Sequence, residues 1–332
     1  MRPSTALFLA SAAMAQAVPP NPPIRNIFTF PRNHFIENIA VRSNSQLLVT
    51  SMSVPHLFAI DPNAAVPNAT IIHTFTNSTG LAGIAEVTPD VFALVTGTWD
   101  LANTRAELGS LAVWKVNFNS LAGPQVSFLT QIANSTIFNG LVRHPTNPRL
   151  LLAADSALGA VWKVDLLTGT YGVAFSSPLL APTGTAMEGL HLGINGLTAR
   201  GNTLYFTNSA QKFFGKVSIN SEGVPTGPIQ VISNSTAAPG TPGNVVYDDI
   251  ALDKKGKVAW IASHPDYAVG VRLNGNNHAQ RVIQNSTLLL NPTAAAFGRG
   301  SRKEERTLYI TNGGEFTPEF DLINEGVVAI DL

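Results

Sequence analysis

Short apolar runs bounded by Gly, Pro, Asn and Asp recur along nearly the whole chain. The stretch 192–209, LGINGLTARGNTLYFTNS, shows the pattern most clearly. Asn195 opens one apolar run, Arg200-Gly201-Asn202 forms a turn, and Thr203–Thr207 is rich in residues favoured in strands. Runs this short, rich in β-branched and aromatic residues and closed by turn formers, predict β-strands rather than helices.

The same unit begins six times along the chain, each time at a small or polar residue that precedes an apolar run. The six starts are Glu37, Ala82, Asn139, Asn195, Asp248 and Thr293. They are separated by 45, 57, 56, 53 and 45 residues. A period of this size is typical of propeller blades. We therefore expect an all-β, six-bladed β-propeller of four-stranded blades.

The sixth unit ends at Leu332, after its third strand, so its outer strand is missing from the C-terminal end. The run 24–30, IRNIFTF, supplies a strand at the other end. Pairing of the first strand with the last blade closes the ring and protects an edge that would otherwise be exposed. We expect one propeller domain that spans residues 18–332.

The pattern of the first residues predicts a targeting segment. Arg2 precedes the apolar run Ala6–Ala13, and Ala15-Gln16-Ala17 offers small residues for a signal peptidase, so residues 1–17 are expected to be a signal peptide. Five Asn-x-Ser/Thr sequons agree with secretion. They lie at Asn68, Asn77, Asn134, Asn234 and Asn285. We expect an extracellular protein of the secretory pathway that carries N-linked glycans.

Charge and cysteine content exclude several kinds of chemistry. Lys and Arg together number 21, as do Asp and Glu, so no net charge steers nucleic acid or an anionic membrane. The absence of cysteine excludes thiol catalysis. The chain also has no Gly-x-Ser-x-Gly elbow, phosphate loop, dinucleotide fingerprint or zinc-type His pair. We expect a monomer that acts on small molecules.

Four unit starts are polar, and they predict a site at one end of the central channel. Because inner propeller strands begin at the same face, Glu37, Asn139, Asn195 and Asp248 should converge there. Such a ring suits a hard cation such as Ca²⁺. It equally suits a polar ligand, with the pKa of one carboxyl raised by the other. A third interpretation is that these side chains only satisfy backbone groups at strand ends.

The loops between second and third strands open at the same face. His264 lies in one of them and is the best candidate for proton transfer, although it could also be an exposed loop histidine. We predict His264, Glu37 and Asp248 as catalytic residues. Predicted substrate contacts are Met52, Trp99, Asn139, Asp155, Asn195, Asn208, Tyr267, Asn312 and Phe316.

These residues carry a resemblance to a known group of proteins. With Glu37, Asn195-Gly196-Leu197 and Asp248, the chain resembles the senescence-marker-protein/gluconolactonase-like six-bladed propellers. The resemblance implies that Glu37, Asn195 and Asp248 bind a divalent cation, usually Ca²⁺. The motifs GTWD at 97–100, SHPD at 263–266 and TNGG at 311–314 indicate a closer resemblance to fungal hetero-Diels–Alderases of tropolonic sesquiterpene biosynthesis.

That closer resemblance implies dehydration of a hydroxymethyl tropolone to an o-quinone methide, followed by a [4+2] cycloaddition with a humulene-type sesquiterpene. No cofactor is required for this chemistry, although the ring is compatible with Ca²⁺. Two alternatives stay open. One is a Ca²⁺-dependent lactonase or related hydrolase, and the other is a non-catalytic propeller that binds a ligand, since one fold hosts many functions.

Overall fold

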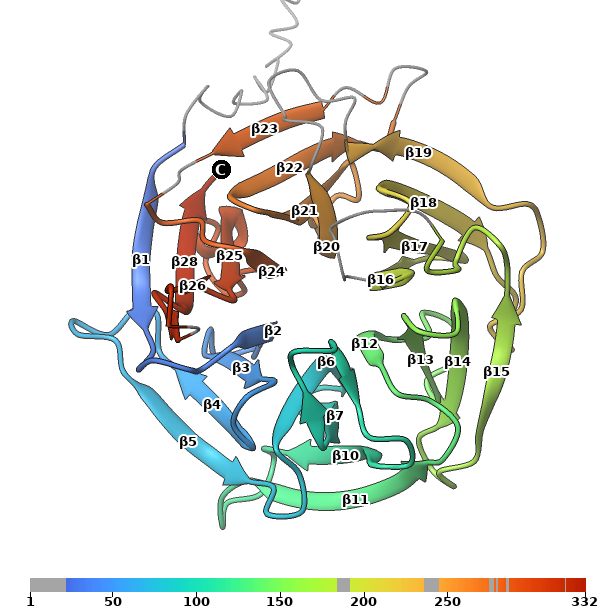
Figure 1. The fold of residues 1–332 in the computed structure, drawn as a ribbon, viewed down its shortest axis with the longest axis horizontal. Coiled ribbons are helices and arrows are strands. Elements are labelled where there is room, and N and C mark those ends of the chain that lie inside the picture. The colour runs from blue at the N-terminus through green and yellow to red at the C-terminus, as the bar shows by residue number, and fades with distance from the viewer. Residues whose placement is uncertain are drawn as a thin grey trace, which may run out of the picture.

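The computed structural model describes residues 22–183, 192–235, 245–274, 278, 280–284, 287–319 and 321–332. The predicted signal peptide of residues 1–17 and the sequon asparagine Asn285 lie outside the described residues. Within them, six four-stranded antiparallel sheets stand around a central axis (Figure 1). The predicted six-bladed propeller is confirmed.

The strands of each blade follow one another from the axis to the rim. Blade 1 comprises β2 (Ile36–Val41), β3 (Leu47–Ser51), β4 (His56–Ile60) and β5 (Ala69–Thr74). Blade 2 comprises β6 (Gly80–Thr88), β7 (Val91–Gly97), β10 (Leu111–Asn117) and β11 (Gln125–Ile132). Blade 3 comprises β12 (Phe138–Arg143), β13 (Leu150–Asp155), β14 (Ala160–Asp165) and β15 (Tyr171–Ser176).

The last three blades repeat this order, with one exchange. Blade 4 comprises β16 (Ile194–Arg200), β17 (Thr203–Asn208), β18 (Phe213–Ser218) and β19 (Gln230–Asn234). Blade 5 comprises β20 (Val246–Leu252), β21 (Val258–His264), β22 (Tyr267–Arg272) and β23 (Gln280–Gln284). Blade 6 comprises β24 (Pro292–Phe297), β25 (Thr307–Asn312), β28 (Gly326–Asp331) and, from the other end of the chain, β1 (Ile24–Thr29). A 3₁₀ turn, η2 (Glu304–Arg306), precedes β25.

The ring is closed by the N-terminal strand, as predicted. Strand β1 pairs antiparallel with β28 from Ile24 opposite Ile330 to Thr29 opposite Gly326. The backbone N–H of Phe30 extends the contact and donates to the carbonyl of Glu325 at 2.8 Å. The two ends of the propeller are therefore held together by main-chain hydrogen bonds, and β1 covers the outer edge of β28, which would otherwise be unpaired.

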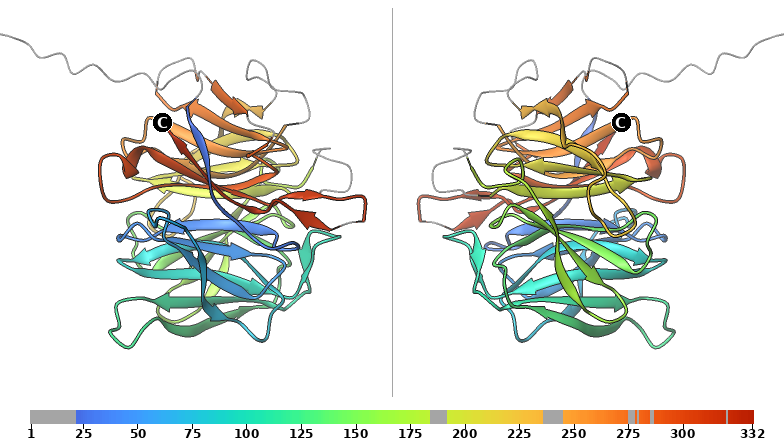
Figure 2. Two further views of the ribbon diagram at one scale, coloured as in Figure 1. Left: turned by 90° about the vertical axis from the view of Figure 1, so that its left-hand side faces the viewer. Right: turned by 90° about the vertical axis from the view of Figure 1, so that its right-hand side faces the viewer.

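Two small hairpins were not predicted from the sequence. Strands β8 (Trp99–Asp100) and β9 (Arg105–Ala106) lie in the loop between the second and third strands of blade 2. Strands β26 (Glu315–Phe316) and β27 (Leu322–Ile323) lie in the equivalent loop of blade 6. The red β26–β27 hairpin projects from one face of the ring in Figure 2.

The apolar core is divided into six clusters of buried side chains, each lying between two neighbouring blades. Every residue of β3 and of β13 is buried, because both faces of these strands pack against an adjacent blade. Strands that are buried on both faces have continuously apolar sequences and do not alternate apolar with polar residues. In the described part of the chain no helix is long and apolar enough to cross a membrane.

Candidate functional site

Each inner strand begins with a β-bulge, and the bulges coincide with the six unit starts seen in the sequence. In β2 the register shifts between Ile36 and Asn38, which leaves Glu37 as the extra residue. The same shift occurs at the start of β6, β12, β16, β20 and β24. Bulges turn a side chain away from its regular alternation. Here they aim the polar unit starts at the head of the channel.

A threonine on the second strand stabilises several of these bulges. The Thr207 hydroxyl accepts the backbone N–H of Gly196 at 2.9 Å and donates to the carbonyl of Asp248 at 2.6 Å. Thr50 makes the equivalent contacts with Asn38 and with Ala82 of the next blade. Because a buried backbone group without a partner is costly, this hydroxyl both permits the bulge and links it to the neighbouring blade.

Glycine follows the bulged residue where neighbouring inner strands approach most closely. A Cβ atom on Gly140 would lie 2.6 Å from the carbonyl oxygen of Asn195. A Cβ atom on Gly196 would lie 2.4 Å from the Oδ1 atom of Asp249. The Asn-Gly pairs of blades 3 and 4 therefore combine a polar side chain at the channel with a backbone that tolerates close contact.

In blades 1 and 5 the residue after the bulged one is Asn38 and Asp249, respectively, instead of glycine. These two side chains meet across the channel. The Asn38 amide donates to Asp249 Oδ2 at 2.8 Å, and the Ile250 backbone N–H donates to Asp249 Oδ1 at 2.7 Å. Burial raises the pKa of Asp249 to about 7. Since Asn38 follows Glu37 and Asp249 follows Asp248 in the chain, this hydrogen bond fixes the two carboxyl-bearing bulges relative to each other.

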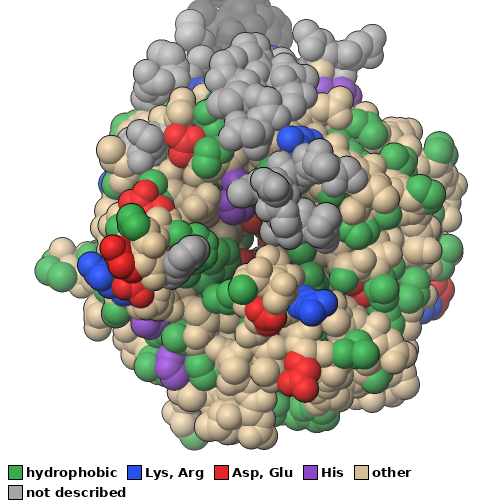
Figure 3. Space-filling view, in the orientation of Figure 1, with side chains coloured by type: hydrophobic (Ala, Val, Ile, Leu, Met, Phe, Trp, Pro, Cys, Tyr) green, Lys and Arg blue, Asp and Glu red, His purple; other side chains and the backbone are tan. Residues whose placement is uncertain are grey.

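A cavity of about 240 Å³ lies above these bulges. Its polar floor is formed by Glu37, Asn139, Asn195, Ser209 and Asp248, with His264 and Asn291 beside it. Its walls are mainly apolar. They comprise Phe35, Met52, Leu101, Ile137, Leu192, Val246, Phe316 and Leu322. In Figure 3 the centre of this face is hollowed, and hydrophobic, acidic and histidine side chains border the hollow.

His264 is held between a carboxyl and an amide. Its Nε2 lies 2.9 Å from Asp248 Oδ2, and its Nδ1 lies 3.3 Å from Asn291 Oδ1. The Asn291 amide nitrogen donates to the carbonyl of Gly314 at 2.5 Å, so its oxygen must face the histidine. Nδ1 therefore carries a proton, and a second proton is shared between Nε2 and Asp248.

The protonation of the three ionisable groups follows from their surroundings. Burial, and then the charges of Asp248 and Asp249, raise the pKa of Glu37 well above its ordinary value. Burial also raises the pKa of Asp248, although the hydrogen bond from His264 opposes it. Burial alone would lower the pKa of His264, but Asp248 and Asn291 raise it overall. Burial and the neighbouring carboxyl groups thus favour the protonated form of Glu37, beside a hydrogen-bonded His264–Asp248 pair.

Three buried oxygen atoms at the floor have no hydrogen-bond donor among the described residues. They are Asn139 Oδ1, Asn195 Oδ1 and Asp248 Oδ1. For Asn195 the orientation is fixed, because its amide donates to Ser209 Oγ at 2.9 Å while that hydroxyl donates to the Tyr247 carbonyl. Buried acceptors without donors are uncommon in folded proteins. These oxygen atoms can therefore accept hydrogen bonds from the hydroxyl groups of a ligand, or they can bind a cation.

The same atoms fit a hard cation. Carboxylate and amide oxygens are the ligands that Ca²⁺ prefers. Among the residues that the structure describes, no three His, Cys, Asp or Glu side chains are placed to share a metal ion. A cation here would therefore depend on the amide oxygens of Asn139 and Asn195 as well as on Glu37 and Asp248.

Seven of the twelve residues predicted from the sequence line this cavity. They are Glu37, Met52, Asn139, Asn195, Asp248, His264 and Phe316. The remaining five lie outside it, and three of these occupy equivalent positions as the last residues of second strands: Asp155, Asn208 and Asn312.

The polar atoms of these three are used to hold loops. Asp155 accepts from the Trp162 indole and from the Leu158 backbone, each at 2.9 Å. Asn208 donates to the carbonyls of Leu179 and Ala181. The Asn312 amide donates to the Leu288 carbonyl at 2.7 Å. A side chain at a strand end satisfies the backbone of the loop that follows, which explains their polarity without a ligand.

The two aromatic residues outside the cavity are packed into the core. Trp99 is 9% exposed and its indole N–H donates to the Gly80 carbonyl at 3.1 Å. Tyr267 is 3% exposed, lies in β22 and packs between blades 4 and 5. Both were predicted to line a cleft, but the hairpin of blade 2 and the start of β22 direct them inwards.

Several lining residues were not predicted. Asn291 precedes the sixth unit start and gave no recognisable signal, because its role depends on the fold of the loop around His264. Leu101 and Leu322 come from the unpredicted hairpins, whereas Ile137, Leu192 and Val246 lie two or three positions before a unit start. An apolar residue just before each bulge is the signal that would have found these last three.

Comparisons with known proteins found similar sequences and similar folds. No protein-family model matches the chain. The chain is 24% identical to a "Putative hetero-Diels-Alderase" of a Phoma species over 322 residues, which are 90% of this chain and 88% of that protein. It is 25% identical to "Putative hetero-Diels-Alderase asR5" of Sarocladium schorii, with coverage of 91% and 80%.

Solved structures show the same fold. A luciferin-regenerating enzyme superposes with a TM-score of 0.65 at 12% identity and covers 94% of this chain and 96% of its own. A structure described as a "putative gluconolactonase" superposes with a TM-score of 0.58 at 12% identity, with coverage of 94% and 93%. Both resemblances indicated by the sequence, to hetero-Diels–Alderases and to gluconolactonase-like propellers, are confirmed as similarities.

Proposed function

We propose that the protein is a hetero-Diels–Alderase that dehydrates a hydroxymethyl tropolone and joins the product to a humulene-type sesquiterpene. The observation that carries this proposal is the cavity itself, in which apolar walls surround a floor of three unpartnered oxygen acceptors. A tropolone that bears a ring hydroxyl and a hydroxymethyl group brings hydroxyl donors for that floor. A sesquiterpene brings a large apolar surface for the walls.

The dehydration needs one acid and one base, and the floor holds both. Glu37 gives its proton to the hydroxymethyl oxygen, the C–O bond breaks, and water leaves. The His264–Asp248 pair takes the proton of the ring hydroxyl, so that the product is a neutral o-quinone methide. Return of that proton to Glu37 restores the site. Positioned acids and bases of this kind typically contribute about 10²–10⁴-fold to a rate.

The cycloaddition forms one C–C and one C–O bond and transfers no proton. The protein contributes orientation, since holding two reactants in one geometry supplies up to about 7–11 kcal/mol in the most favourable models. The apolar walls also keep water from adding to the quinone methide. Leu101, Phe316 and Leu322 reach the cavity from the two hairpins and provide its outermost apolar cover.

A Ca²⁺-dependent lactonase is the second candidate, and the unpartnered oxygen atoms of Asn139, Asn195 and Asp248 favour it. When bound, the cation would polarise the carbonyl of a lactone. Glu37, Asn139, Asn195 and Asp248 would hold the cation. The apolar walls favour the first candidate, because sugar lactones are small and polar.

The decisive experiment incubates the protein with a hydroxymethyl tropolone and hydroxyhumulene and compares the adducts with those of the uncatalysed reaction. We expect faster formation of one stereoisomer. A racemic mixture formed at the uncatalysed rate would overturn the proposal. Loss of a lactonase activity on chelation, with recovery on addition of Ca²⁺, would support the second candidate instead.

We further propose that the chain is secreted as a glycosylated monomer. The supporting features are the signal-peptide pattern of residues 1–17 and the exposure of the sequon residues Asn68, Asn77, Asn134 and Asn234. Expression of the full chain in a fungal host tests both parts. Intact mass and gel filtration of the protein from the medium should show glycans and a single propeller. Retention of the protein inside the cells would contradict it.

A further inference from the structure

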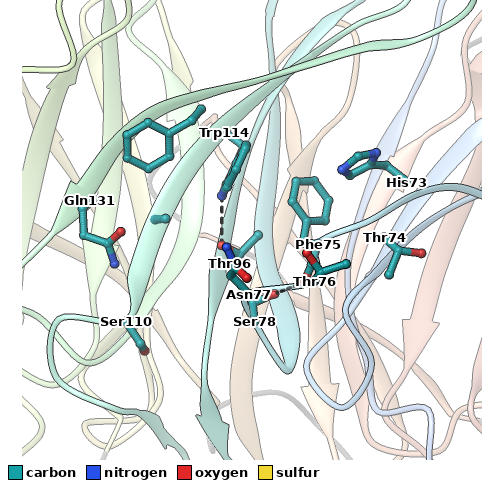
Figure 4. A pocket seen from close by; sticks show the side chains of 12 residues that line it. His73, Thr74, Phe75, Thr76, Asn77, Ser78, Thr96, Ser110, Trp114 and Gln131 are labelled. Carbon is teal, nitrogen blue, oxygen red and sulfur yellow. Dashed lines mark hydrogen bonds between the residues drawn. The ribbon is translucent and has the colours of Figure 1, made fainter.

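A second cavity lies far from the channel, at the rim between blades 1 and 2. Its volume is about 310 Å³ (Figure 4). One side is aromatic and is formed by His73, Phe75, Trp114 and Phe128. The other side is polar and includes Thr76, Asn77, Ser78, Thr96, Ser110 and Gln131. We call this cavity the rim groove.

The aromatic side of the rim groove is a continuous row of rings. Phe75 and Phe128 each meet Trp114 edge to face, with ring centroids 5.4 Å and 5.3 Å apart. His73 meets Phe75 in the same way at 4.7 Å. The Trp114 indole N–H is held by the Thr96 hydroxyl at 3.1 Å, which fixes the ring. Phe128 is 52% exposed, although it is a large apolar residue. The groove is thus rigid and incompletely covered.

One residue of the groove is the asparagine of a glycosylation sequon. Asn77 belongs to Asn77-Ser78-Thr79 and is exposed, while the hydroxyl of the neighbouring Ser78 donates to the Phe75 carbonyl at 3.1 Å. Figure 4 shows Asn77 among the residues that line the groove. Asn77 lies in the connection from β5 to β6, and Asn134 lies in the equivalent connection from β11 to β12. The rim groove therefore has a predicted modification site built into its wall.

We propose that the rim groove seats the first sugar residues of an N-linked glycan on Asn77. This inference rests on the proposed passage through the secretory pathway. In that modification Asn77 Nδ2 forms a bond to C1 of an N-acetylglucosamine. The bond from C1 to the diphosphate of the lipid-linked oligosaccharide donor breaks, and the amide proton leaves with the diphosphate.

The chemistry of the groove matches a sugar that is tethered at its edge. The faces of a pyranose ring carry C–H groups, which pack against the electron-rich faces of aromatic rings such as Phe128. Gln131 donates to the Gly109 carbonyl at 2.6 Å, so its carbonyl oxygen is left to accept from a sugar hydroxyl or acetamido N–H. The volume lies at the lower end of the roughly 300–1,000 Å³ of ligand pockets. That size suits one or two sugar rings and not a folded partner.

The test compares two sequons within one protein. The full chain is secreted from a glycosylating host, occupancy is determined by peptide mass spectrometry, and glycan release by an endoglycosidase is timed on folded protein. Asn68 is the control, because it is exposed in the loop before β5, at the opposite end of blade 1. We expect release from Asn77 to be about tenfold slower than from Asn68, since it requires the seated sugar to leave the groove.

A surface variant shows whether the groove causes the protection. Phe128→Ser should bring the rate of release from Asn77 up to that of Asn68. The matched control is Val231→Ser, which alters an exposed apolar residue of β19 and should leave both rates unchanged. Both positions are exposed, so neither change endangers the fold.

Each result has one meaning. Equal release rates at the two sequons, or protection that survives Phe128→Ser, would overturn the inference. Occupied Asn68 with unoccupied Asn77 would overturn it too, while leaving the proposed secretion intact. Absence of glycan at every sequon of a protein retained in the cell would contradict both the inference and the proposed secretion.

Discussion

Asn291 Oδ1 faces His264 Nδ1 at 3.3 Å, and it has no freedom to turn away, because its amide nitrogen donates to Gly314. Asn291 lies just before β24, whereas His264 ends β21. This contact determines which ring nitrogen of His264 is free to exchange a proton with Asp248. Asn291 is therefore a positioning residue that acts through His264.

Substitution of Asn291 should move the pKa of His264 in a direction set by the new side chain. Asn291→Leu removes the acceptor that raises this pKa and should lower it. Asn291→Asp places a negative charge there and should raise it. Titration of the histidine ring protons by NMR, with His264→Gln to assign the signal, measures the shift. Shifts of the same sign in both variants would contradict the assigned role.

Glu37→Gln should abolish most of the dehydration, because glutamine retains the shape of the protonated acid but cannot release a proton. We expect a loss of about 10²–10⁴-fold in kcat, the range for a general acid. The matched control is Glu86→Gln, since Glu86 pairs with Arg299 outside the cavity. A preformed o-quinone methide should still undergo cycloaddition with the variant. Equal losses with both substrates would show that Glu37 acts in binding alone.

Asp249 should make the protein more stable in acid than at neutral pH. Its pKa rises on folding from 3.8 to about 7, so the folded state holds the proton more tightly than the unfolded state. This stability is complete below about pH 4 and is lost as the pH rises through about 7. Asp249→Asn removes this component, which amounts to at most about 4 kcal/mol. Urea unfolding across that interval should show a flatter pH dependence in the variant, and identical slopes would contradict it.

Phe316→Ala should admit water to the cavity. Phe316 is 62% exposed and contributes to the cover of the site from the β26–β27 hairpin. We expect more of the hydrated by-product relative to cycloadduct, with the rate of dehydration unchanged, since Glu37 and His264 are not disturbed. Product ratios by chromatography measure this. A change in dehydration alone would assign Phe316 another role.

Thr207→Val should destabilise the fold through the bulge of blade 4. The change leaves the Gly196 N–H and the Asp248 carbonyl without their hydroxyl partner. A buried polar group left unpaired costs about 1–3 kcal/mol. The control is Thr198→Val, a half-buried position of β16. Denaturant unfolding of both variants should show a loss for Thr207→Val only.

The period of the unit starts determined the number of blades, and the missing outer strand determined how the ring closes. Both are encoded locally, because strand formers, turn formers and their spacing follow from short stretches of chain. The same pattern located Glu37, Asn139, Asn195 and Asp248, since each of these four bulges is marked by a polar residue before an apolar run. Their convergence followed from the fold class alone.

Only the tertiary structure decided what the loop residues do. Asp155, Asn208 and Asn312 look like ligand contacts in the sequence, yet their polar atoms satisfy neighbouring backbone. Trp99 looks like a cleft aromatic, yet an unpredicted hairpin buries it. Asn291 carries no recognisable signal in the sequence, yet it orients His264. The direction of a loop side chain depends on contacts between blades distant in sequence, and no local pattern encodes these.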